Sequence, residues 1–315
     1  MRSRTKLIIL FVIALILIGL FLLTDLSFNW DYVLPRRTMK ILAIILTGCA
    51  IAFSTVVFQT ITNNRILTPS IIGLDSLYLL IQTFIIFAFG SAHMTLMNQH
   101  VNFIISVILM VIFALLLYHF LFKREGQNIY FLLLIGIIFG TFFNSLAEFM
   151  QVLIDPNEFQ VVQDRMFASF NNVNTDLFNI SLILMVLAAL YFLRFAKYLD
   201  VMALGKDHAI NLGVNYDSVV KQMLVVVAIM ISVATVLVGP ITFLGLLVAN
   251  VAYQFLKTYR HRDLILGAML ISVIALVGGQ FIVERVFTFT TTISVIINFI
   301  GGVYFIYLLL RESRA

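Results

Sequence analysis

The chain carries one compact polar segment between two long apolar runs, at residues 204–216, with the sequence LGKDHAINLGVNY. Asp207 would lie in the first turn of a short helix, where negative charge is stabilised, and Gly213 stands where a helix C-terminus favours a left-handed residue. We expect an exposed helix that contacts a partner protein; a solvated connecting loop is the alternative. The residues available for such contacts are Leu204, Gly205, Lys206, Asp207, His208, Ile210, Asn211, Leu212 and Gly213.

The other reactive side chains predict no enzyme chemistry. Cys49 is the single cysteine, so the chain alone can form neither an internal disulfide nor a thiolate cluster. No two of the five histidines are three or four residues apart, which argues against a metal site. Gly205 and Lys206 are followed by Asp207 rather than Ser or Thr, so the phosphate-binding loop of ATPases is incomplete. We therefore expect no catalytic residue, no metal ligand and no cofactor bound by this chain.

Composition places the chain among membrane proteins. Hydrophobic residues make up 62% and charged residues 11% of its 315 residues, whereas soluble domains are about half apolar and about one quarter charged. The apolar runs are continuous rather than alternating, which excludes an outer-membrane barrel. We expect a single all-α polytopic membrane domain over residues 1–315. The formal net charge of +5 is explained by the loops between spans, so we expect no nucleic-acid partner.

Ten apolar runs approach the roughly 20 residues that a helix needs to cross a bilayer. They are residues 7–23, 41–61, 71–90, 101–122, 129–147, 177–196, 219–238, 240–256, 264–283 and 291–310. Only Gly239 and Pro240 separate the seventh run from the eighth. Residues 239–256 could therefore cross the membrane fully or re-enter it from one side.

The basic residues predict how these helices are oriented. Fifteen of the 20 Lys and Arg residues would lie on the side of the N-terminus, and basic loops favour the cytoplasm. Both termini and residues 197–218 should therefore be cytoplasmic, and residues 148–176 external. The first run lacks a cleavage site, so we expect it to remain as a helix. The five external basic residues are Arg36, Arg37, Lys40, Arg165 and Arg285.

Charges inside the predicted spans distinguish two kinds of transporter. Ion-coupled carriers place titratable groups near the membrane midplane. Here Asp75 and Glu148 fall near the ends of predicted spans, and the deep polar residues are neutral. This pattern favours transport driven from outside the membrane. An ion-coupled secondary transporter is the alternative, and an intramembrane enzyme would need paired carboxylates, a Ser-His pair or a metal set in the spans.

Four segments, in order along nearly the whole chain, match one known pattern. Residues 34–78 contain L-P-R, a small-residue span and the run NNRILTPSIIG; LGKDHAINLGV, VGPITFLGLLVANVAY and IGGVYFIYLLLRE follow. Together they resemble the FecCD-like permeases of type II ABC importers, which carry iron-siderophore complexes and cobalamin. Ala249-Asn250 replaces a Pro-His pair common in that family, and Val303 replaces a proline. These departures put the local helix kinks in doubt, not the family.

The resemblance implies a type II ABC importer permease fold and a set of partners. A second homologous permease would pair with this chain as a heterodimer, and two ATPase subunits holding ATP-Mg would bind inside. An extracytoplasmic binding protein would deliver a ferric siderophore to a bacterial cytoplasmic membrane. The segments FQTITNNRILTPSIIGLDSLYLL and RMFASFNNVN look closer to the catecholate or petrobactin-type branch, with haem or cobalamin as alternative substrates.

The resemblance also implies roles for individual residues. Residues 204–213 would couple transport to the ATPase. The binding protein would dock on Arg36, Arg37 and Arg285, although anchoring to lipid phosphates is the alternative. The translocation path would include Gly48, Ser54, Gln59, Asn63, Asn64, Pro69 and Gly73, and ordinary helix packing explains each one equally well. Residues 148–176, with Phe159, Met166, Phe167 and Phe170, would form a short amphipathic element on the outer surface or a plain loop.

Overall fold

The computed structural model describes residues 3–24, 30–96, 99–122, 129–171 and 173–312, and its regular elements there are helices alone. Ten of them are apolar and correspond one by one to the ten predicted spans. Seven are long enough to cross a membrane, and three have shorter apolar stretches. The ten are α1 (Ser3–Leu23), α2 (Trp30–Ile61), α3 (Leu74–Leu96), α4 (Gln99–Phe122), α5 (Ile129–Leu153), α7 (Thr175–Leu193), α10 (Tyr216–Val238), α11 (Leu244–Leu256), α12 (His261–Arg285) and α13 (Ile293–Glu312).

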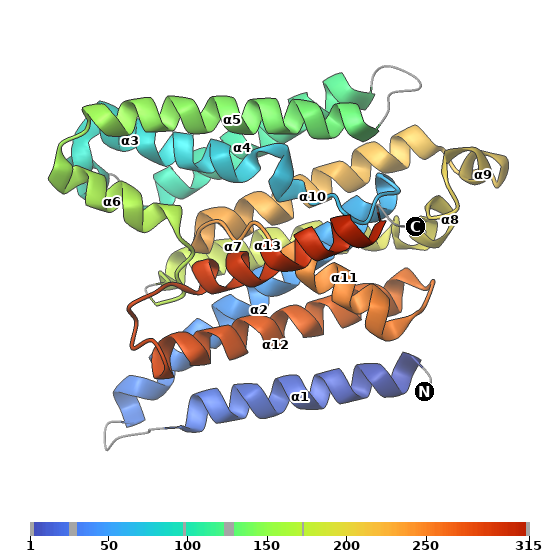
Figure 1. Cartoon of the computed structure of the whole chain (residues 1–315), viewed down its shortest axis with the longest axis horizontal. Helices are drawn as coiled ribbons and strands as arrows, with labels where there is room; N and C mark the ends of the chain where they lie inside the picture. Colours follow the sequence, from blue (N-terminus) through green and yellow to red (C-terminus); the bar gives the residue numbers. More distant parts are fainter. Residues whose placement is uncertain (1–2, 25–29, 97–98, 123–128, 172, 313–315) are drawn as a thin grey trace.

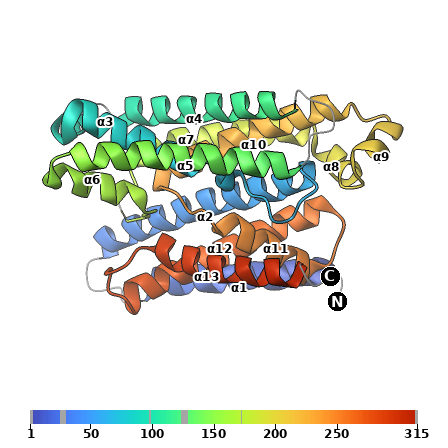
Figure 2. The same cartoon turned by 45° about the horizontal axis from the view of Figure 1, so that its top comes forward.

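Short elements occupy the two ends of this bundle (Figures 1 and 2). One end, called the α6 end here, carries α6 (Pro156–Met166). The opposite end, called the α9 end, carries η2 (Ala196–Tyr198), α8 (Leu199–Met202) and α9 (Lys206–Asn211), together with the start of α1 and the end of α13. The start of α1, the end of α13 and the polar segment therefore lie on one side, as the ten-span count requires.

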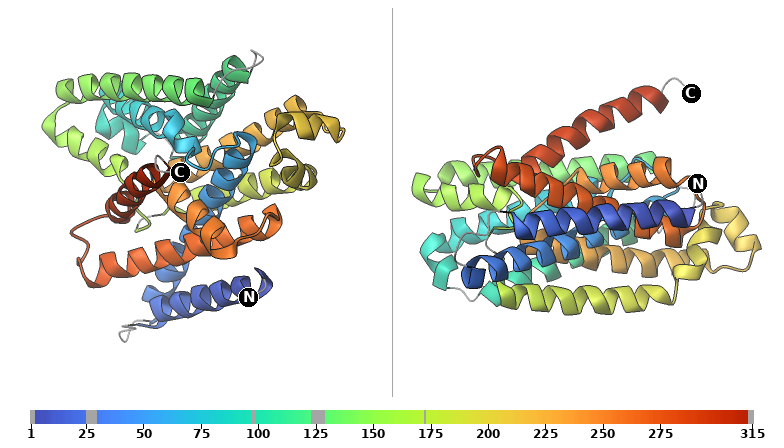
Figure 3. Two further views of the ribbon diagram at one scale, coloured as in Figure 1. Left: turned by 45° about the vertical axis from the view of Figure 1, so that its right-hand side comes forward. Right: turned by 90° about the horizontal axis from the view of Figure 1, so that it is seen from below.

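Two helices form the centre of the fold. In the most apolar 18-residue stretch of α2 and of α10, 78% of the residues are buried, compared with 17% for α1. α1 lies at one edge, and α13 diverges from the other helices (Figure 3). The Phe53 and Phe192 rings meet edge to face with centroids 4.6 Å apart, which packs α7 against α2. The outer helices retain apolar side chains on their exposed faces, as expected for contact with lipid or another subunit.

Two helices differ in length from their predicted spans. α2 has 32 residues, about 48 Å, and extends beyond a hydrocarbon core about 30 Å thick. α11 has 13 residues, about 20 Å, too short to cross that core alone. Residues 239–243 form no helix, and Gly239 ends α10 with φ of 99°. Glycine is needed there because a Cβ would lie 2.9 Å from the Ala168 Cα atom.

Candidate functional site

The polar segment of residues 204–216 contains a short helix with a glycine at each boundary, as we expected from the sequence. Gly205 has φ of 97° and precedes α9, and Gly213 has φ of 83° and follows it. The Val214 amide donates to the Ala209 carbonyl at 3.0 Å, across the left-handed Gly213. This is the six-to-one hydrogen bond of a glycine-terminated helix. The backbone then turns directly into α10, whose first turn is capped by the Asn215 side chain.

α9 presents apolar side chains away from the bundle. Leu204, Ile210 and Leu212 are 58%, 49% and 63% exposed. Ala209 and Val214 are buried and hold the element against the bundle. Lys206, Asp207, His208 and Asn211 are exposed around the apolar group. An apolar centre with a polar rim is the anatomy of a protein contact surface.

Among the predicted path residues of α2 and the following turn, Gln59 is buried and Asn64 is half-buried, whereas Asn63 is exposed. The amide of Gln59 donates to the Arg65 carbonyl at 2.6 Å, and that of Asn250 donates to the same oxygen at 3.1 Å. Asn64 accepts a hydrogen bond from the Ile66 amide, and Asn63 has φ of 49° at the turn that ends α2. The Asn250 side chain thus joins α11 to the turn after α2.

Pro69 and Gly73 hold the next part of this turn deep in the bundle. Pro69 begins η1 (Pro69–Ile72), and Gly73 ends it with φ of 90°. A Cβ on Gly73 would lie 3.0 Å from the backbone nitrogen of Gly140, near the middle of α5. α3 therefore begins at about mid-depth rather than at the membrane surface. Glycine is required here because the two backbones touch.

Gly48 and Ser54 are buried in helix packing. A Cβ on Gly48 would lie 2.9 Å from the Ser272 hydroxyl and from Leu276, so Gly48 permits the close approach of α2 and α12. Ser54 is fully buried in α2. Neither residue lines the two cavities described below. In the single subunit, Gly48 therefore serves a contact between helices, and Ser54 is enclosed by the packed bundle.

Asp75 corrects the expectation that the deep polar residues are neutral. Its side chain lies in the first turn of α3 and is only 8% exposed. The Thr242 hydroxyl donates to its carboxylate at 2.8 Å. The sequence placed Asp75 near a span end because η1, which carries the chain back into the bundle, cannot be recognised from hydropathy. A titratable group therefore does lie within the apolar layer.

The three arginines predicted to dock a partner have different surroundings at the α6 end. Arg37 donates to the carbonyls of Phe21, Leu22 and Thr24, so it satisfies the free carbonyls at the end of α1. Arg285 donates to the Thr24 carbonyl at 3.4 Å. Arg36 is exposed and lies over the Tyr32 ring at 4.1 Å. Arg36 is the most available of the three for a partner.

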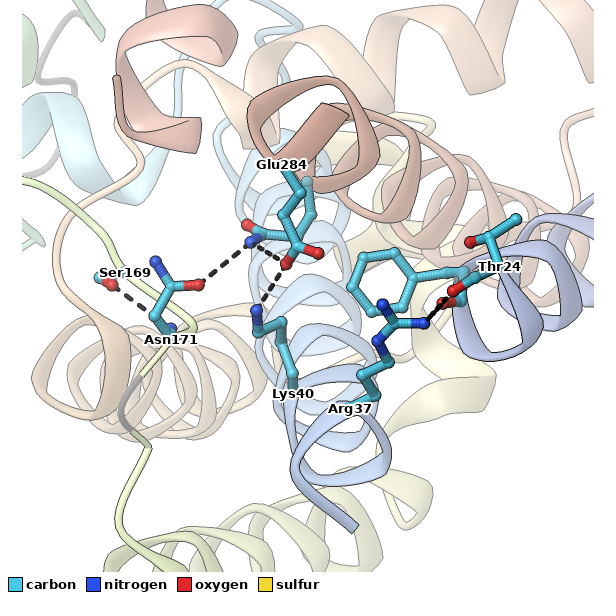
Figure 4. A network of polar contacts seen from close by, with 8 residues as sticks. Thr24, Arg37, Lys40, Ser169, Asn171 and Glu284 are labelled. Atoms are coloured by element: carbon cyan, nitrogen blue, oxygen red, sulfur yellow. Dashed lines mark hydrogen bonds and ion pairs between the residues drawn. The ribbon is translucent and has the colours of Figure 1, made fainter. Parts of the chain in front are cut away.

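A polar network at the α6 end was not expected from the sequence (Figure 4). Lys40 of α2 and Glu284 of α12 form an ion pair of 2.5 Å, with side chains 13% and 12% exposed. Gln280 donates to Glu284 at 2.9 Å and to Asn171 at 3.2 Å. The network joins α2, α12 and the segment after α6. Opposite charges at the outer ends of two predicted spans were the signal that could have revealed it.

Residues 148–176, which we predicted to be external, contain a helix rather than a plain loop. Asp155 caps α6 through the Asn157 amide, and Val162 packs inward at 1% exposure. Phe170 is also 1% exposed, which corrects its predicted place on the outer surface. It is buried because residues 167–171 cross the end of α10, where the Ser169 amide donates to the Val238 carbonyl at 2.8 Å.

Comparisons with known proteins agree on one family. The sequence model of the FecCD transport family matches residues 5–311 of this chain. The petrobactin import system permease protein YclO of Bacillus subtilis is 66% identical over 315 residues, the full length of both chains. The petrobactin import system permease protein FatC of Bacillus anthracis is 39% identical over 280 residues, 89% of this chain and 79% of that one. A structure described as an inward-facing metal-chelate type ABC transporter has the same fold, with a TM-score of 0.84 at 20% identity over 98% of this chain and 99% of the other.

Proposed function

Because this chain belongs to the FecCD transport family, we propose that it is the permease that carries a ferric siderophore of the petrobactin type across the bacterial cytoplasmic membrane. The observation that carries this proposal is the 66% identity, over both full lengths, with a petrobactin import permease. The 39% identity with a second such permease supports the same substrate class. The chain would act as a conduit for this substrate.

The energy for transport would come from a separate ATPase bound to α9. Support comes from the exposed apolar residues of this short helix and from its position beyond the ends of the spanning helices (Figure 1). Lys206 and Asp217 lie 3.6 Å apart and link α9 to the first turn of α10. A movement of the partner against α9 would therefore reach α10, one of the two central helices. The α9 end would face the cytoplasm, with both termini.

A second permease would complete the path, which a single subunit cannot enclose. α13 diverges from the other helices and leaves an apolar face uncovered, with Phe299 and Val303 at 72% and 57% exposure (Figure 3). We propose this face as part of the contact with a homologous permease. The binding protein would approach the opposite end, where Arg36 is exposed.

Uptake of iron-55 tests the substrate in cells that lack their own copy of this permease. Cells carrying the chain and its partner subunits should accumulate label from ferric petrobactin, and excess unlabelled ferric petrobactin should abolish it. Ferric hydroxamates, haem and labelled cobalamin are the comparison substrates. Uptake of one of these at a higher rate than ferric petrobactin would show that the substrate assignment is wrong.

A further inference from the structure

An apolar cavity opens beside the α9 end and carries no role in the proposed transport cycle. Its volume is about 770 Å³, within the range of small-molecule sites. α2, α7, α10 and α12 supply its walls, which include Ala50, Phe53, Ala189 and Ile265. The rim includes Leu193 and Leu266, which are 65% and 46% exposed. The cavity therefore opens sideways from the bundle, where the hydrocarbon chains of lipids lie.

The depth of this cavity suits the part of an acyl chain nearest the head group of a lipid. Its lining on α12 runs from His261 to Met269, and its lining on α7 runs from Met185 to Leu193. At the 1.5 Å rise of a helix, these stretches are each about 10 to 12 Å long. The cavity thus begins at the polar end of the helices and continues into the apolar layer.

A second, polar hollow continues from the mouth of this cavity. Its volume is about 930 Å³, and it shares Asp200, Arg262 and Leu266 with the apolar cavity. Arg4 and Arg260 also line it. The apolar and the polar hollow meet at Arg262. Together they match a lipid, whose hydrocarbon chain would occupy the apolar hollow and whose head group would occupy the polar one.

The charge around the shared mouth favours an anion. Four basic side chains, from Arg4, Lys197, Arg260 and Arg262, line the two hollows, compared with two carboxylates. Asp200 is engaged by the His261 amide at 2.8 Å and by the His261 ring at 2.7 Å. Asp263 accepts a hydrogen bond from Ser3. Within the described part of the chain, no ion pair involves Lys197 or Arg262.

We propose that these joined hollows bind an anionic glycerophospholipid, with one acyl chain between α7 and α12 and the phosphate between Lys197 and Arg262. Basic pockets between membrane helices bind the head groups of acidic lipids through such contacts. The site lies beside η2 and α8, which lead into α9. A bound lipid would hold this end of α7 and α12 in place while α9 is displaced.

Native mass spectrometry of the delipidated full-length chain tests the head-group preference. Dioleoyl phosphatidylglycerol should bind more tightly than dioleoyl phosphatidylcholine. The variant Lys197→Gln with Arg262→Gln should lose about fivefold in affinity for each removed cation, roughly 30-fold in total. The matched control is Lys221→Gln with Arg194→Gln, which changes the charge equally but alters no residue of either hollow. Equal loss in both variants, or equal affinity for the two lipids, would overturn the proposal.

Cys49 reports on the acyl chain without any substitution, because the single cysteine of the protein lines the apolar cavity. Saturating phosphatidylglycerol should slow its reaction with N-ethylmaleimide, whereas the same amount of phosphatidylcholine should not. Ala189→Trp, which fills the cavity at unchanged charge, should weaken binding of phosphatidylglycerol. An unchanged reaction rate in the presence of bound lipid would place the acyl chain elsewhere and contradict this site. Neither readout depends on uptake, so a wrong substrate assignment would leave both unaffected.

Discussion

The ammonium group of Lys40 lies 2.5 Å from the carboxylate of Glu284, so one ion pair joins α2 to α12 at the α6 end (Figure 4). The side chains are 13% and 12% exposed. Lys40 also lies 5.6 Å from the centre of the Phe289 ring. A charge in such surroundings is stable only with its partner, because removing one member leaves the other poorly solvated. The pair therefore fixes how α2 and α12 meet at the α6 end.

Lys40→Met and Glu284→Gln should each lower the free energy of unfolding by about 3 kcal/mol. The double variant should lose less than the sum of the two, with a coupling free energy of about 1 to 3 kcal/mol. Denaturation of the purified chain in detergent, for all members of the double-mutant cycle, measures this coupling. Additive losses would show that the two groups act independently.

Gly213→Val should abolish coupling to the ATPase while the chain still docks the binding protein. The left-handed backbone at Gly213 would cost a β-branched residue about 1 to 3 kcal/mol and would misdirect α9. ATPase co-purification and siderophore uptake should fall together, while the chain still inserts into the membrane. Gly213→Asn is the matched control, because Asn tolerates this conformation. Equal loss with Asn would show that backbone conformation is not the cause.

Leu212→Asp tests the exposed apolar surface of α9 without altering the backbone. The side chain is 63% exposed, so the folded chain should keep its stability within about 0.5 kcal/mol. Binding of the ATPase should nevertheless fall, because a carboxylate would replace apolar contact. Co-purification of the ATPase at the level of the unaltered chain would mean that the exposed apolar surface of α9 does not contact the ATPase.

Arg36 and Arg37 should behave differently despite being neighbours. Arg36→Glu should slow association with the binding protein, most strongly at low salt, because exposed charges act mainly on encounter rate. Arg37→Glu should instead lower stability, because Arg37 satisfies the last carbonyls of α1. Association rates at two salt concentrations and thermal denaturation distinguish these effects. Unchanged association of the Arg36 variant at low salt would exclude a docking role.

Hydropathy predicted the fold closely, because a bilayer imposes a minimum length on every spanning helix. It could not place residues whose position depends on the chain re-entering the bundle. Asp75 and Gly73 are deep because η1 packs against α5 near Gly140. Phe170 is buried because its segment crosses the end of α10. Such contacts join residues far apart in sequence, so no local pattern reveals them.

The candidate site was predictable where local chemistry determines it. The glycines around α9 and the polar residues between them predict a capped, exposed helix, which the structure contains. The roles of Arg37 and Lys40 were not predictable, because both depend on partners in other helices, at the end of α1 and in α12. Basic residues near a span end show the same sequence pattern whether they face a partner protein, a lipid head group or another helix. Four of the fifteen basic residues that we predicted on the side of the N-terminus lie outside the described residues, namely Arg2, Lys123, Arg124 and Arg314.

Asp75→Asn tests whether the buried carboxylate takes part in ion coupling. An ATP-driven permease should keep most of its uptake, because Asn can still accept the hydrogen bond from Thr242. A proton-coupled carrier should lose uptake, since the amide cannot bind and release a proton. Initial rates of ferric siderophore uptake, at equal amounts of protein in the membrane, measure the effect. Complete loss of uptake with normal folding would favour the secondary transporter.

Uptake into vesicles of defined content tests the central claim most directly. The vesicles contain this chain, its partner permease and the ATPase, with the binding protein and iron-55 petrobactin outside. Enclosed ATP should drive accumulation of label, whereas a non-hydrolysable analogue should not, and dissipating the proton gradient should leave the rate unchanged. Accumulation driven by a proton gradient in vesicles without the ATPase would contradict the assignment of this chain as the permease of an ATP-driven importer.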